Sequence, residues 1–462
     1  MHEPVTLAIL GAGNRGADVY AAWALAHPEE ARVVAVADPD PARRQAVARA
    51  HGLAPERQFA SWQELLAHHR LADAIVIATP DRQHVEPAVR AIELGYDVLL
   101  EKPIAPTPEG VRRVAEAEAE ARARSGGRGP SVTVAHVLRY TPFFSTIKRL
   151  LDDGAIGQLV SLQYTENIGY WHFAHSYVRG NWRNAAASSP MILAKSCHDL
   201  DMMRWLVGRS WRSLSSYGSL VHFRPDNAPP GAPERCTDGC PHAEQCPFDA
   251  VRFYVETMKE STDWPVSVIT RDFTPEGRLE ALRRGPYGRC VYRCDNDVVD
   301  HQVVAIEFEG GVTAAFSVCA FTEENTRTLK LMGTRGEIRG HLEKGEIEVR
   351  RFAGAPWAVR AAGRAGTAGA AGAEGAAEGA GEAGGDPVEV LRVVGRGRHA
   401  GGDDGLMAAF VRRVRARKAG ETPEEALTSL AESLESHLMA FAAEESRLVG
   451  RVVRNEAVTP AA

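Results

Sequence analysis

The segment Ile9-Leu10-Gly11-Ala12-Gly13-Asn14-Arg15-Gly16 decides the fold. It follows a continuous apolar run at 5–10 and precedes a stretch with helical character. Each glycine has its own physical reason: Gly11 permits a tight turn, Gly13 lets phosphates approach the backbone, and Gly16 lets helix and strand pack closely. The free N–H groups at the start of the following helix can bind phosphate. Together these features predict a dinucleotide-binding βαβ unit.

Four more apolar runs occupy the first 136 residues, at 33–37, 74–78, 97–100 and 132–135. They are continuous rather than alternating, which is typical of strands covered on both faces. Helix-like segments, such as 108–124, separate them. This alternation predicts an α/β domain over residues 1–136 with a doubly wound parallel sheet of the Rossmann type.

The pattern changes after residue 136. Apolar runs now alternate or lie close together, with Gly310-Gly311 as a hairpin signal between two of them. We expect a second α/β domain at 137–462, built on a large, mostly antiparallel open sheet with strands at 159–165, 214–223, 302–308, 312–321, 327–332 and 346–351. Two insertions are predicted, one bearing cysteines at about 225–297 and one rich in Ala and Gly at about 354–386, which we expect to be flexible.

The last part of the chain returns to helical spacing. The segment His399-Ala400-Gly401-Gly402-Asp403-Asp404 precedes a helix, and we expect Asp403 or Asp404 to cap its N-terminus. A buried stripe is predicted further on, at Leu427, Leu430, Leu434, Leu438 and Phe441.

Composition narrows the function classes. Hydrophobic residues make up 44%, charged residues 25%, and the net charge is −6, which is typical of a soluble globular protein and gives no reason to expect a nucleic-acid or membrane partner. No run approaches the ~20 apolar residues of a spanning helix, and no secretory signal is visible. We therefore expect a cytoplasmic enzyme, in which the seven cysteines would be thiols or metal ligands.

The second strand ends at Asp38, about twenty residues beyond the last glycine of the motif. Its carboxylate can accept hydrogen bonds from both ribose hydroxyls and would repel a 2′-phosphate. NAD is therefore favoured, but Arg43 and Arg44 lie close enough in sequence to keep NADP as an alternative.

Glu101-Lys102-Pro103 directly follows the fourth parallel strand, at the edge where α/β sheets place their ligands. Together with Ala78-Thr79-Pro80 and His84, this motif resembles the Gfo/Idh/MocA oxidoreductase family. Later landmarks follow in the same order: Arg139-Tyr140-Thr141-Pro142, Gly154-Ala155-Ile156-Gly157 and His198-Asp199-Leu200-Asp201. The predicted cofactor-binding residues are Gly11, Gly13, Asn14, Arg15, Gly16, Asp38, Thr79, Pro80, His84, Glu101 and Lys102.

The resemblance covers nearly the whole chain and implies a catalytic pair. Lys102 would lie near the nicotinamide and the reacting hydroxyl, and His198 would assist proton transfer or bind substrate hydroxyls. Many dehydrogenases of the family carry an aspartate four residues before that histidine, where this chain has Ala194, followed by Lys195. Either Lys195 takes over as a third catalytic residue, or the chemistry differs from simple alcohol oxidation. The family's open sheet often forms an oligomer interface, so we expect a homo-oligomer, a dimer or a tetramer.

Residues 170–183 are dense in aromatic and hydrogen-bonding side chains. A carbohydrate site needs rings to cover C–H faces and polar groups to reach hydroxyls; an interface or core loop is the alternative. The predicted substrate-binding residues are Arg139, Tyr140, His172, His175, Tyr177, Arg179, Trp182 and Arg183.

Five cysteines cluster in two loops. Cys236-x3-Cys240-x5-Cys246 lies in a Pro- and Gly-rich loop, and Cys290-x3-Cys294 follows about forty residues later. Such thiols predict a structural tetrahedral zinc site, with Cys290 or Cys294 completing a set of four ligands. An iron–sulfur cluster and plain reduced thiols are the alternatives.

The leading functional prediction is an NAD(P)-dependent oxidoreductase that transfers hydride between a hydroxyl of a sugar, polyol or sugar derivative and nicotinamide. Lys102 would be the general acid/base and His198 a proton relay. Ala194 motivates an alternative, NAD-dependent glycoside cleavage through a transient keto intermediate. A non-catalytic NAD- or sugar-binding protein is the third hypothesis.

Overall fold

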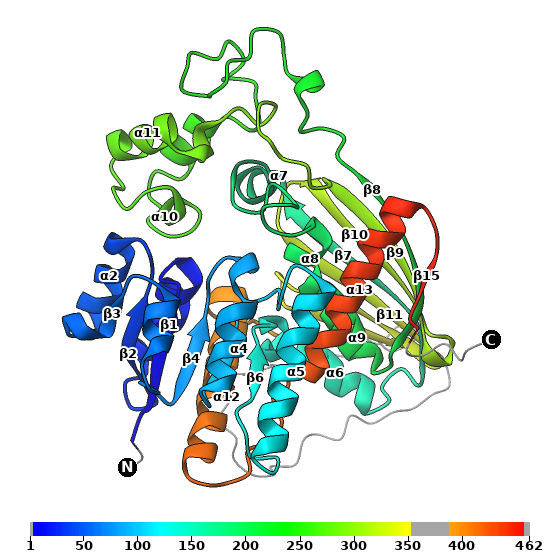
Figure 1. Ribbon diagram of the computed structural model, residues 1–462. Helices are drawn as coiled ribbons and strands as arrows, with labels where there is room; N and C mark the ends of the chain where they lie inside the picture. Colours follow the sequence, from blue (N-terminus) through cyan, green and yellow to red (C-terminus); the bar gives the residue numbers. More distant parts are fainter. Residues whose placement is uncertain (1–2, 353–387, 457–462) are drawn as a thin grey trace.

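The computed structural model describes residues 3–352 and 388–456 and contains two sheets, each covered by helices (Figure 1). The predicted Ala/Gly-rich insertion at about 354–386 lies outside the described residues. Within the described residues, no helix combines the length and apolar character needed to cross a membrane.

The first sheet is parallel and has the strand order β3-β2-β1-β4-β5-β6. The five strands that continuous apolar runs predicted are all present. The sixth, β3, has only two residues, too few to give a sequence pattern. The strands are β1 Val5–Leu10, β2 Ala31–Ala37, β3 Gln58–Phe59, β4 Ala74–Ile77, β5 Asp97–Leu100 and β6 Val132–Val134.

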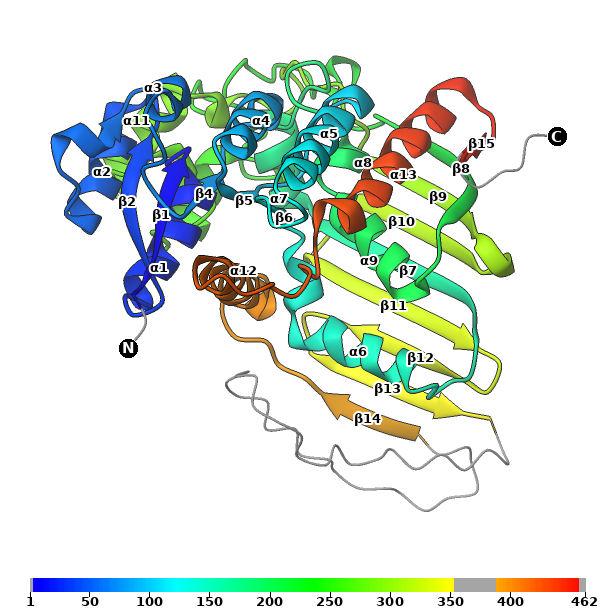
Figure 2. The ribbon, with the colours of Figure 1, turned by 60° about the horizontal axis from the view of Figure 1, so that its bottom comes forward.

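Helices cover both faces of this sheet, which explains why its strands are apolar on both sides. In β1, Ala8 and Leu10 face one core, while Leu7 and Ile9 face the other. The first core is closed by α3 Trp62–Ala67, α4 Val85–Glu93 and α5 Pro108–Arg124. The second is closed by the helix after the glycine motif, which includes η1 Gly16–Ala21 and α1 Ala22–Ala26, and by α12 Gly402–Lys418. The chain thus returns to the first sheet near its C-terminal end (Figure 2).

The second sheet has nine strands in the order β14-β13-β12-β11-β7-β10-β9-β8-β15. All its neighbouring strands are antiparallel except β7 with β10. The prediction of a mostly antiparallel sheet is therefore confirmed. Strands β12, β14 and β15 were not predicted. The bounds are β7 Leu159–Gly169, β8 Trp211–Ser219, β9 His301–Phe308, β10 Thr313–Thr322, β11 Thr326–Gly333, β12 Gly336–His341, β13 Glu346–Arg351, β14 Val388–Arg392 and β15 Val453–Arg454.

Helices pack on one face of the second sheet (Figure 2). They include α6 Pro142–Asp152, α8 Met191–Ala194, α9 Cys197–Val207 and α13 Leu430–Val449. Helices do not cover the opposite face in the part of the chain that the structure describes. Tyr217 of β8 and Val303 of β9 lie opposite each other on that face, and both are exposed. The predicted hairpin at Gly310-Gly311 is confirmed, with φ of +74° and +80°.

Of two local predictions near the C-terminus, one is wrong and the other holds in part. The N-cap of α12 is Gly401, and neither Asp403 nor Asp404 caps the helix; Asp403 instead turns toward Arg15. The predicted buried stripe is confirmed at Leu430, which is buried in α13, but Leu427 precedes that helix and is exposed.

The cysteine-bearing insertion extends over the edge of the first sheet (Figure 1). It carries η7 Arg252–Thr257, α10 Val266–Ile269 and α11 Pro275–Arg284 around a small core of its own. Arg271 of the insertion forms an ion pair with Asp18, just after the glycine motif, at 3.0 Å. The insertion therefore borders the predicted cofactor site.

Candidate functional site

The glycine loop between β1 and the following helix fits a dinucleotide. Gly11 has φ +89°, and a Cβ there would lie 2.5 Å from the Ala78 carbonyl oxygen. A Cβ on Gly16 would lie 1.8 Å from the Gly11 carbonyl oxygen. By contrast, a Cβ on Gly13 would have no heavy atom within 4 Å. The protein's own backbone therefore requires glycine at Gly11 and Gly16, whereas Gly13 borders space that a ligand can enter.

Asp38 is 5% exposed and holds this loop in place. One carboxylate oxygen accepts a hydrogen bond from the Ala12 N–H at 2.6 Å, and the other accepts from the Asp40 N–H at 2.8 Å. Arg44 donates to the Asp38 carbonyl oxygen at 2.5 Å. Asp38, which is predicted to bind the ribose, and Arg44, whose positive charge would suit a 2′-phosphate, therefore lie together at the end of β2 Ala31–Ala37.

Arg15 of the glycine motif is the centre of a polar cluster. Its guanidinium lies 2.5 Å from Glu101, 2.7 Å from the Tyr20 hydroxyl and 2.7 Å from Asp403. Burial disfavours the ionised form of Glu101, but Arg15 and Lys102 outweigh this effect and hold its pKa below the usual range. The cluster joins the loops after β1 and β5 to the first turn of α12.

His84 braces the two neighbouring loops after β4 and β5. Its ring nitrogens lie 2.8 Å from the Thr79 carbonyl oxygen and 2.7 Å from the Pro103 carbonyl oxygen. Because both nitrogens are engaged, His84 positions the loops that carry Thr79, Pro80 and Lys102.

The loop after β5, which carries Lys102, meets the segment of α8 and α9 that carries Ala194 and His198. Lys102 Nζ donates to the Ala194 carbonyl oxygen at 3.0 Å and lies 5.9 Å from the centre of the Trp182 ring. His198 is 7% exposed at the start of α9, and its Nδ1 has no partner among the described residues. Burial and, next, the charge of Lys102 lower the pKa of His198 well below its usual value. The predicted pair is thus brought to one place.

Lys195 points into a separate buried ion cluster. Its Nζ lies 3.0 Å from Glu166, which also pairs with Arg327 at 2.5 Å. Arg327 pairs in turn with Asp199 at 2.8 Å. Burial raises the pKa of Asp199 to about 7, although Arg327 opposes the rise. Lys195 is therefore an ion-paired neighbour of the site, and sequence reasoning missed its partner Glu166.

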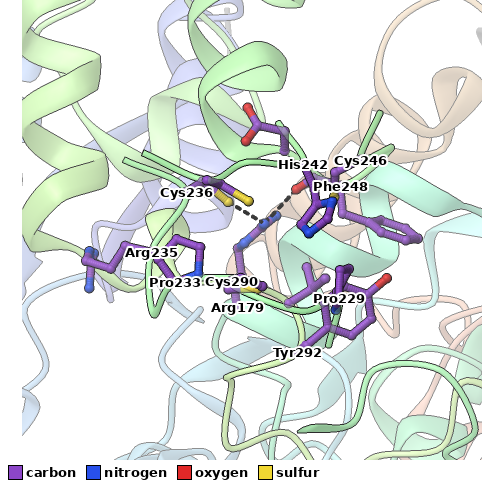
Figure 3. Close-up of a pocket in the computed structure, with 14 residues that line it drawn as sticks. Arg179, Pro229, Pro233, Arg235, Cys236, His242, Cys246, Phe248, Cys290 and Tyr292 are labelled. Carbon is purple, nitrogen blue, oxygen red and sulfur yellow. Dashed lines mark hydrogen bonds between the residues drawn. The ribbon is translucent and has the colours of Figure 1, made fainter. Parts of the chain in front are cut away.

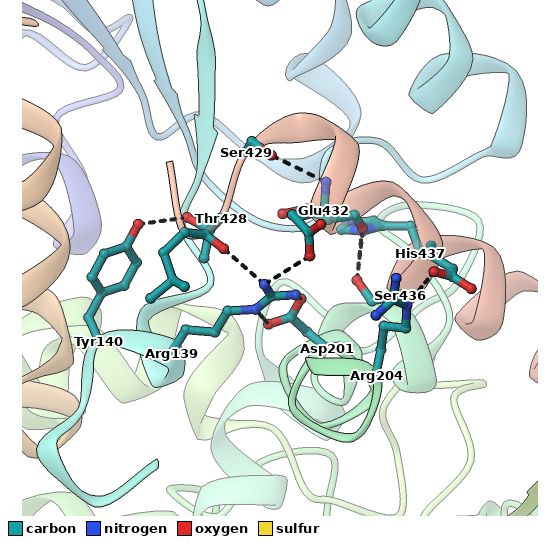
Figure 4. A network of polar contacts seen from close by, with 12 residues as sticks. Arg139, Tyr140, Asp201, Arg204, Thr428, Ser429, Glu432, Ser436 and His437 are labelled. Carbon is teal, nitrogen blue, oxygen red and sulfur yellow. Dashed lines mark hydrogen bonds and ion pairs between the residues drawn. The ribbon is translucent and has the colours of Figure 1, made fainter. Parts of the chain in front are cut away.

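Arg139 and Tyr140, predicted to bind substrate, belong to a structural network (Figure 4). Arg139 is 1% exposed and forms a two-pronged ion pair with Asp201, at 2.7 and 2.9 Å. It also donates to the Leu427 carbonyl oxygen, and the Tyr140 hydroxyl contacts Thr428 at 3.1 Å. These contacts leave Arg139 closed off from any substrate and correct that prediction. Asp201 therefore has a structural role, as the partner of Arg139.

Most of the aromatic segment 170–183 anchors the cysteine-bearing insertion. His175 and Tyr177 are each 3% exposed, and His175 Nδ1 lies 2.6 Å from the Tyr254 hydroxyl of the insertion. Arg183 pairs with Asp295 at 2.9 Å. His172 contacts Asn325 at 2.7 Å and lies against the Trp264 ring. Trp182 differs from these residues of the segment, because its ring lies beside Lys102.

The predicted zinc ligands surround an arginine (Figure 3). Cys236, Cys240, Cys246 and Cys290 line one small cavity with Arg179, whose guanidinium lies 3.7 Å from Cys236 Sγ. Arg179 is 2% exposed and also donates to the carbonyl oxygens of Phe248 and Arg289, both at 2.7 Å. Within residues 3–352 and 388–456, no three His, Cys, Asp or Glu side chains are arranged to hold a metal ion. The structure therefore does not support zinc here, because a cation already lies among the thiols.

Three more histidines lie near His198; sequence reasoning missed His136 and His437 and noted His399 only within the segment before a helix. His136 lies 5.7 Å from His198, His399 lies 6.3 Å from His198, and His437 lies 5.5 Å from His136, measured between ring centres. They come from three segments far apart in the chain, so no local motif groups them.

Comparison with known proteins identifies the family. Residues 5–126 match the NAD-binding Rossmann-fold domain of an oxidoreductase family, and residues 148–357 match its C-terminal alpha/beta domain. The chain belongs to the Gfo/Idh/MocA oxidoreductase family.

Similar curated proteins include the putative oxidoreductase YteT of Bacillus subtilis, 28% identical over 273 residues, which are 58% of this chain and 60% of YteT. Inositol 2-dehydrogenase 2 of Saccharopolyspora erythraea is 34% identical over 209 residues, 44% of this chain and 54% of that protein. The match thus spans little more than half the length of each relative.

Solved structures confirm the fold. An oxidoreductase from Agrobacterium radiobacter, in complex with NAD+, L-tartaric acid and magnesium, has a TM-score of 0.64 and 17% identity, covering 99% of this chain and all of that one. A levoglucosan dehydrogenase in complex with NADH and levoglucosan has a TM-score of 0.65 and 18% identity, covering 98% of this chain and 99% of that one.

Proposed function

We propose that this protein is an NAD-dependent oxidoreductase that transfers hydride between a hydroxyl of a sugar or polyol and the cofactor. The observation that carries this proposal is the approach of Lys102 to the segment of Ala194 and His198, on a loop that the Glu101–Arg15 ion pair joins to the glycine motif. The similar proteins named inositol dehydrogenase and levoglucosan dehydrogenase support a polyhydroxylated substrate.

The roles of the chain's own residues follow from their contacts. When bound, NAD supplies the hydride acceptor. The Gly11–Gly16 loop and Asp38 would hold it, with NADP as the alternative that Arg44 keeps open. Lys102 Nζ takes the proton from the reacting hydroxyl, and His198 passes protons to or from that position. The Trp182 ring offers an apolar surface to the sugar C–H groups.

One observation favours a second candidate, NAD-dependent glycoside cleavage through a transient keto intermediate. Lys102 donates to the main-chain carbonyl of Ala194, where many relatives in the family have a carboxylate. Release of free sugar from a glycoside, with no net change in NADH, would identify this reaction.

We further propose that residues 1–136 bind the cofactor and residues 137–462 bind the substrate, and that copies of the chain associate through the open face of the second sheet. The exposed Tyr217 and Val303 on that face support association. Light scattering would measure the oligomeric state.

The test of the main proposal combines binding and turnover. Wild-type protein is expected to bind NAD in calorimetry and to form NADH with one or more of a panel of inositols, aldoses and anhydrosugars. Lys102→Ala should lower kcat by about 10²–10⁴-fold, because the proton acceptor is lost. Lys148→Ala is the control, because it removes a lysine that pairs with the exposed Asp152 on another helix of the second domain, α6. Full turnover by Lys102→Ala would contradict the role of Lys102.

A further inference from the structure

We propose that His399 and Asp403 form a His–Asp pair that completes the proton relay of this site, in place of the carboxylate that Ala194 lacks. This inference rests on the proposed oxidation of a hydroxyl group. Neither residue belongs to a motif of the first domain, since His399 directly precedes α12 and Asp403 lies in its first turn.

The contact between the two side chains is short and well fixed. His399 Nδ1 donates to Asp403 Oδ2 at 2.8 Å, and Asp403 Oδ1 accepts from Arg15 at 2.7 Å. The Asp403 side chain is 4% exposed. Burial opposes its ionisation, but Arg15 and His399 outweigh burial and hold the pKa of Asp403 well below its usual range. An ionised carboxylate therefore orients the imidazole and leaves its Nε2 free to exchange a proton.

His399 also occupies a position that suits a relay. Four imidazoles follow one another in the order His399, His198, His136 and His437, with ring centres 6.3, 5.7 and 5.5 Å apart. The His399 side chain is 43% exposed, whereas the other three residues are at most 7% exposed. His399 is thus the member through which a proton can reach solvent, with one water bridging to His198.

The backbone at this point is strained. His399 and Ala400 have φ of +45° and +51°, in the left-handed region that residues other than glycine rarely adopt. The segment is held by Arg398, which donates to the Asp18 carbonyl oxygen at 2.9 Å and pairs with Asp263 at 2.8 Å. Strain of this kind is retained where the surroundings enforce it and is concentrated at functional sites.

The other carboxylates near His198 are already neutralised. Glu166 pairs with Lys195 and Arg327, and Asp199 pairs with Arg327. Burial lowers the pKa of His399, Asp403 of α12 opposes this effect, and Arg15 of the glycine loop and Arg327 of β11 add to it. Asp403 is therefore the carboxylate that contacts His399, the exposed histidine of the row.

The proton balance is simple. Oxidation of the hydroxyl sends two electrons and one hydrogen to the cofactor as hydride and leaves one proton on Lys102 Nζ. That proton passes to His198, then through water to His399, where Asp403 stabilises the imidazolium, and then to solvent. Lys102 can then accept the proton of the next hydroxyl. His399 acts through His198 and is a positioning residue of the relay rather than a group that touches the substrate.

The experiment compares His399→Ala and Asp403→Asn with His301→Ala. His301 is the matched control, because its Nδ1 lies 2.8 Å from Asp300 and its side chain is 43% exposed, but it faces the open side of the second sheet. We expect His399→Ala to lower kcat at least about 10-fold, to change the pH profile of kcat and to regain activity when imidazole is added. The Kd of NAD, from calorimetry, should stay within about twofold of wild type.

Asp403→Asn should lower kcat without rescue by imidazole, and in NMR titrations of the protein without ligands it should shift the His399 midpoint downward. Wild-type kcat and pH profile in both variants would overturn the relay. A loss of kcat that imidazole does not restore in His399→Ala, together with a loss of NAD binding, would overturn it in favour of a structural role. If wild-type protein binds NAD but oxidises no polyol, the proposed function fails and the relay with it. The NMR titration distinguishes that result from failure of the His–Asp pair alone.

Discussion

The edge of the first sheet and the segment 170–183 both present many functional side chains in the sequence, but the fold uses them in opposite ways. At the edge, Gly13 borders open space, and the Arg15–Glu101 ion pair joins its loop to the loop that brings Lys102 to Ala194. In the segment, His175, Tyr177 and Arg179 are all at most 3% exposed. Residue types alone therefore did not separate a binding site from a buried contact.

The difference has a physical cause. The insertion at about 225–297 has only a small core, so its main-chain carbonyl groups need partners from the body of the protein. Arg179 satisfies those of Phe248 and Arg289, and His175 reaches the Tyr254 hydroxyl. A motif whose spacing has a backbone reason, such as the three glycines, is thus a better guide than a dense run of polar and aromatic residues.

Replacing Arg179 should lower stability without affecting cofactor binding, and this is the largest difference we expect between the two regions. Arg179→Met leaves the carbonyl oxygens of Phe248 and Arg289 buried without a donor, and we expect the free energy of unfolding to fall by about 3 kcal/mol. The Kd of NAD should not change. Urea unfolding and calorimetry measure the two effects.

Arg183→Met is the matched control for this change. Arg183 is in the same segment, but its partner Asp295 is 57% exposed, so the loss should stay within about 1 kcal/mol. An Arg179 variant with wild-type stability and a raised KM for sugar would show that the segment binds substrate after all.

Acid should destabilise the protein through two buried histidines, His175 of the segment 170–183 and His437 of α13. Burial lowers the pKa of His175 and of His437 to about 3. Below the unfolded value of about 6.5 the unfolded chain binds more protons than the folded one, so stability is lost as pH falls from there. Each such histidine contributes about 1.4 kcal/mol per pH unit over that window.

His175→Phe keeps the ring that stacks on Tyr287 and removes one of these titrations. Urea unfolding between about pH 7 and pH 5 should show a slope smaller by about one proton than that of wild type. An unchanged slope would mean that His175 is protonated in the folded protein.

Much of the fold, and part of the site, could be predicted from the sequence. Five strands of the first sheet could be predicted because they are continuous apolar runs. Strands β3 and β15 have two residues each, which is too short to give a pattern. Lys102 and His198 were found through short motifs. The link from Arg15 to Asp403 spans 388 positions, and that from Lys195 to Glu166 depends on how α8 meets β7. Such pairs arise only from tertiary packing, which no local spacing encodes.

A calorimetric titration with NAD shows whether the space beside Gly13 receives the cofactor. Because a Cβ on Gly13 meets no protein atom within 4 Å, Gly13→Val should fold with wild-type stability. Its side chain would fill the ligand's approach, and we predict that the Kd of NAD rises at least about 100-fold. Wild-type affinity for NAD in a stably folded Gly13→Val protein would contradict the account.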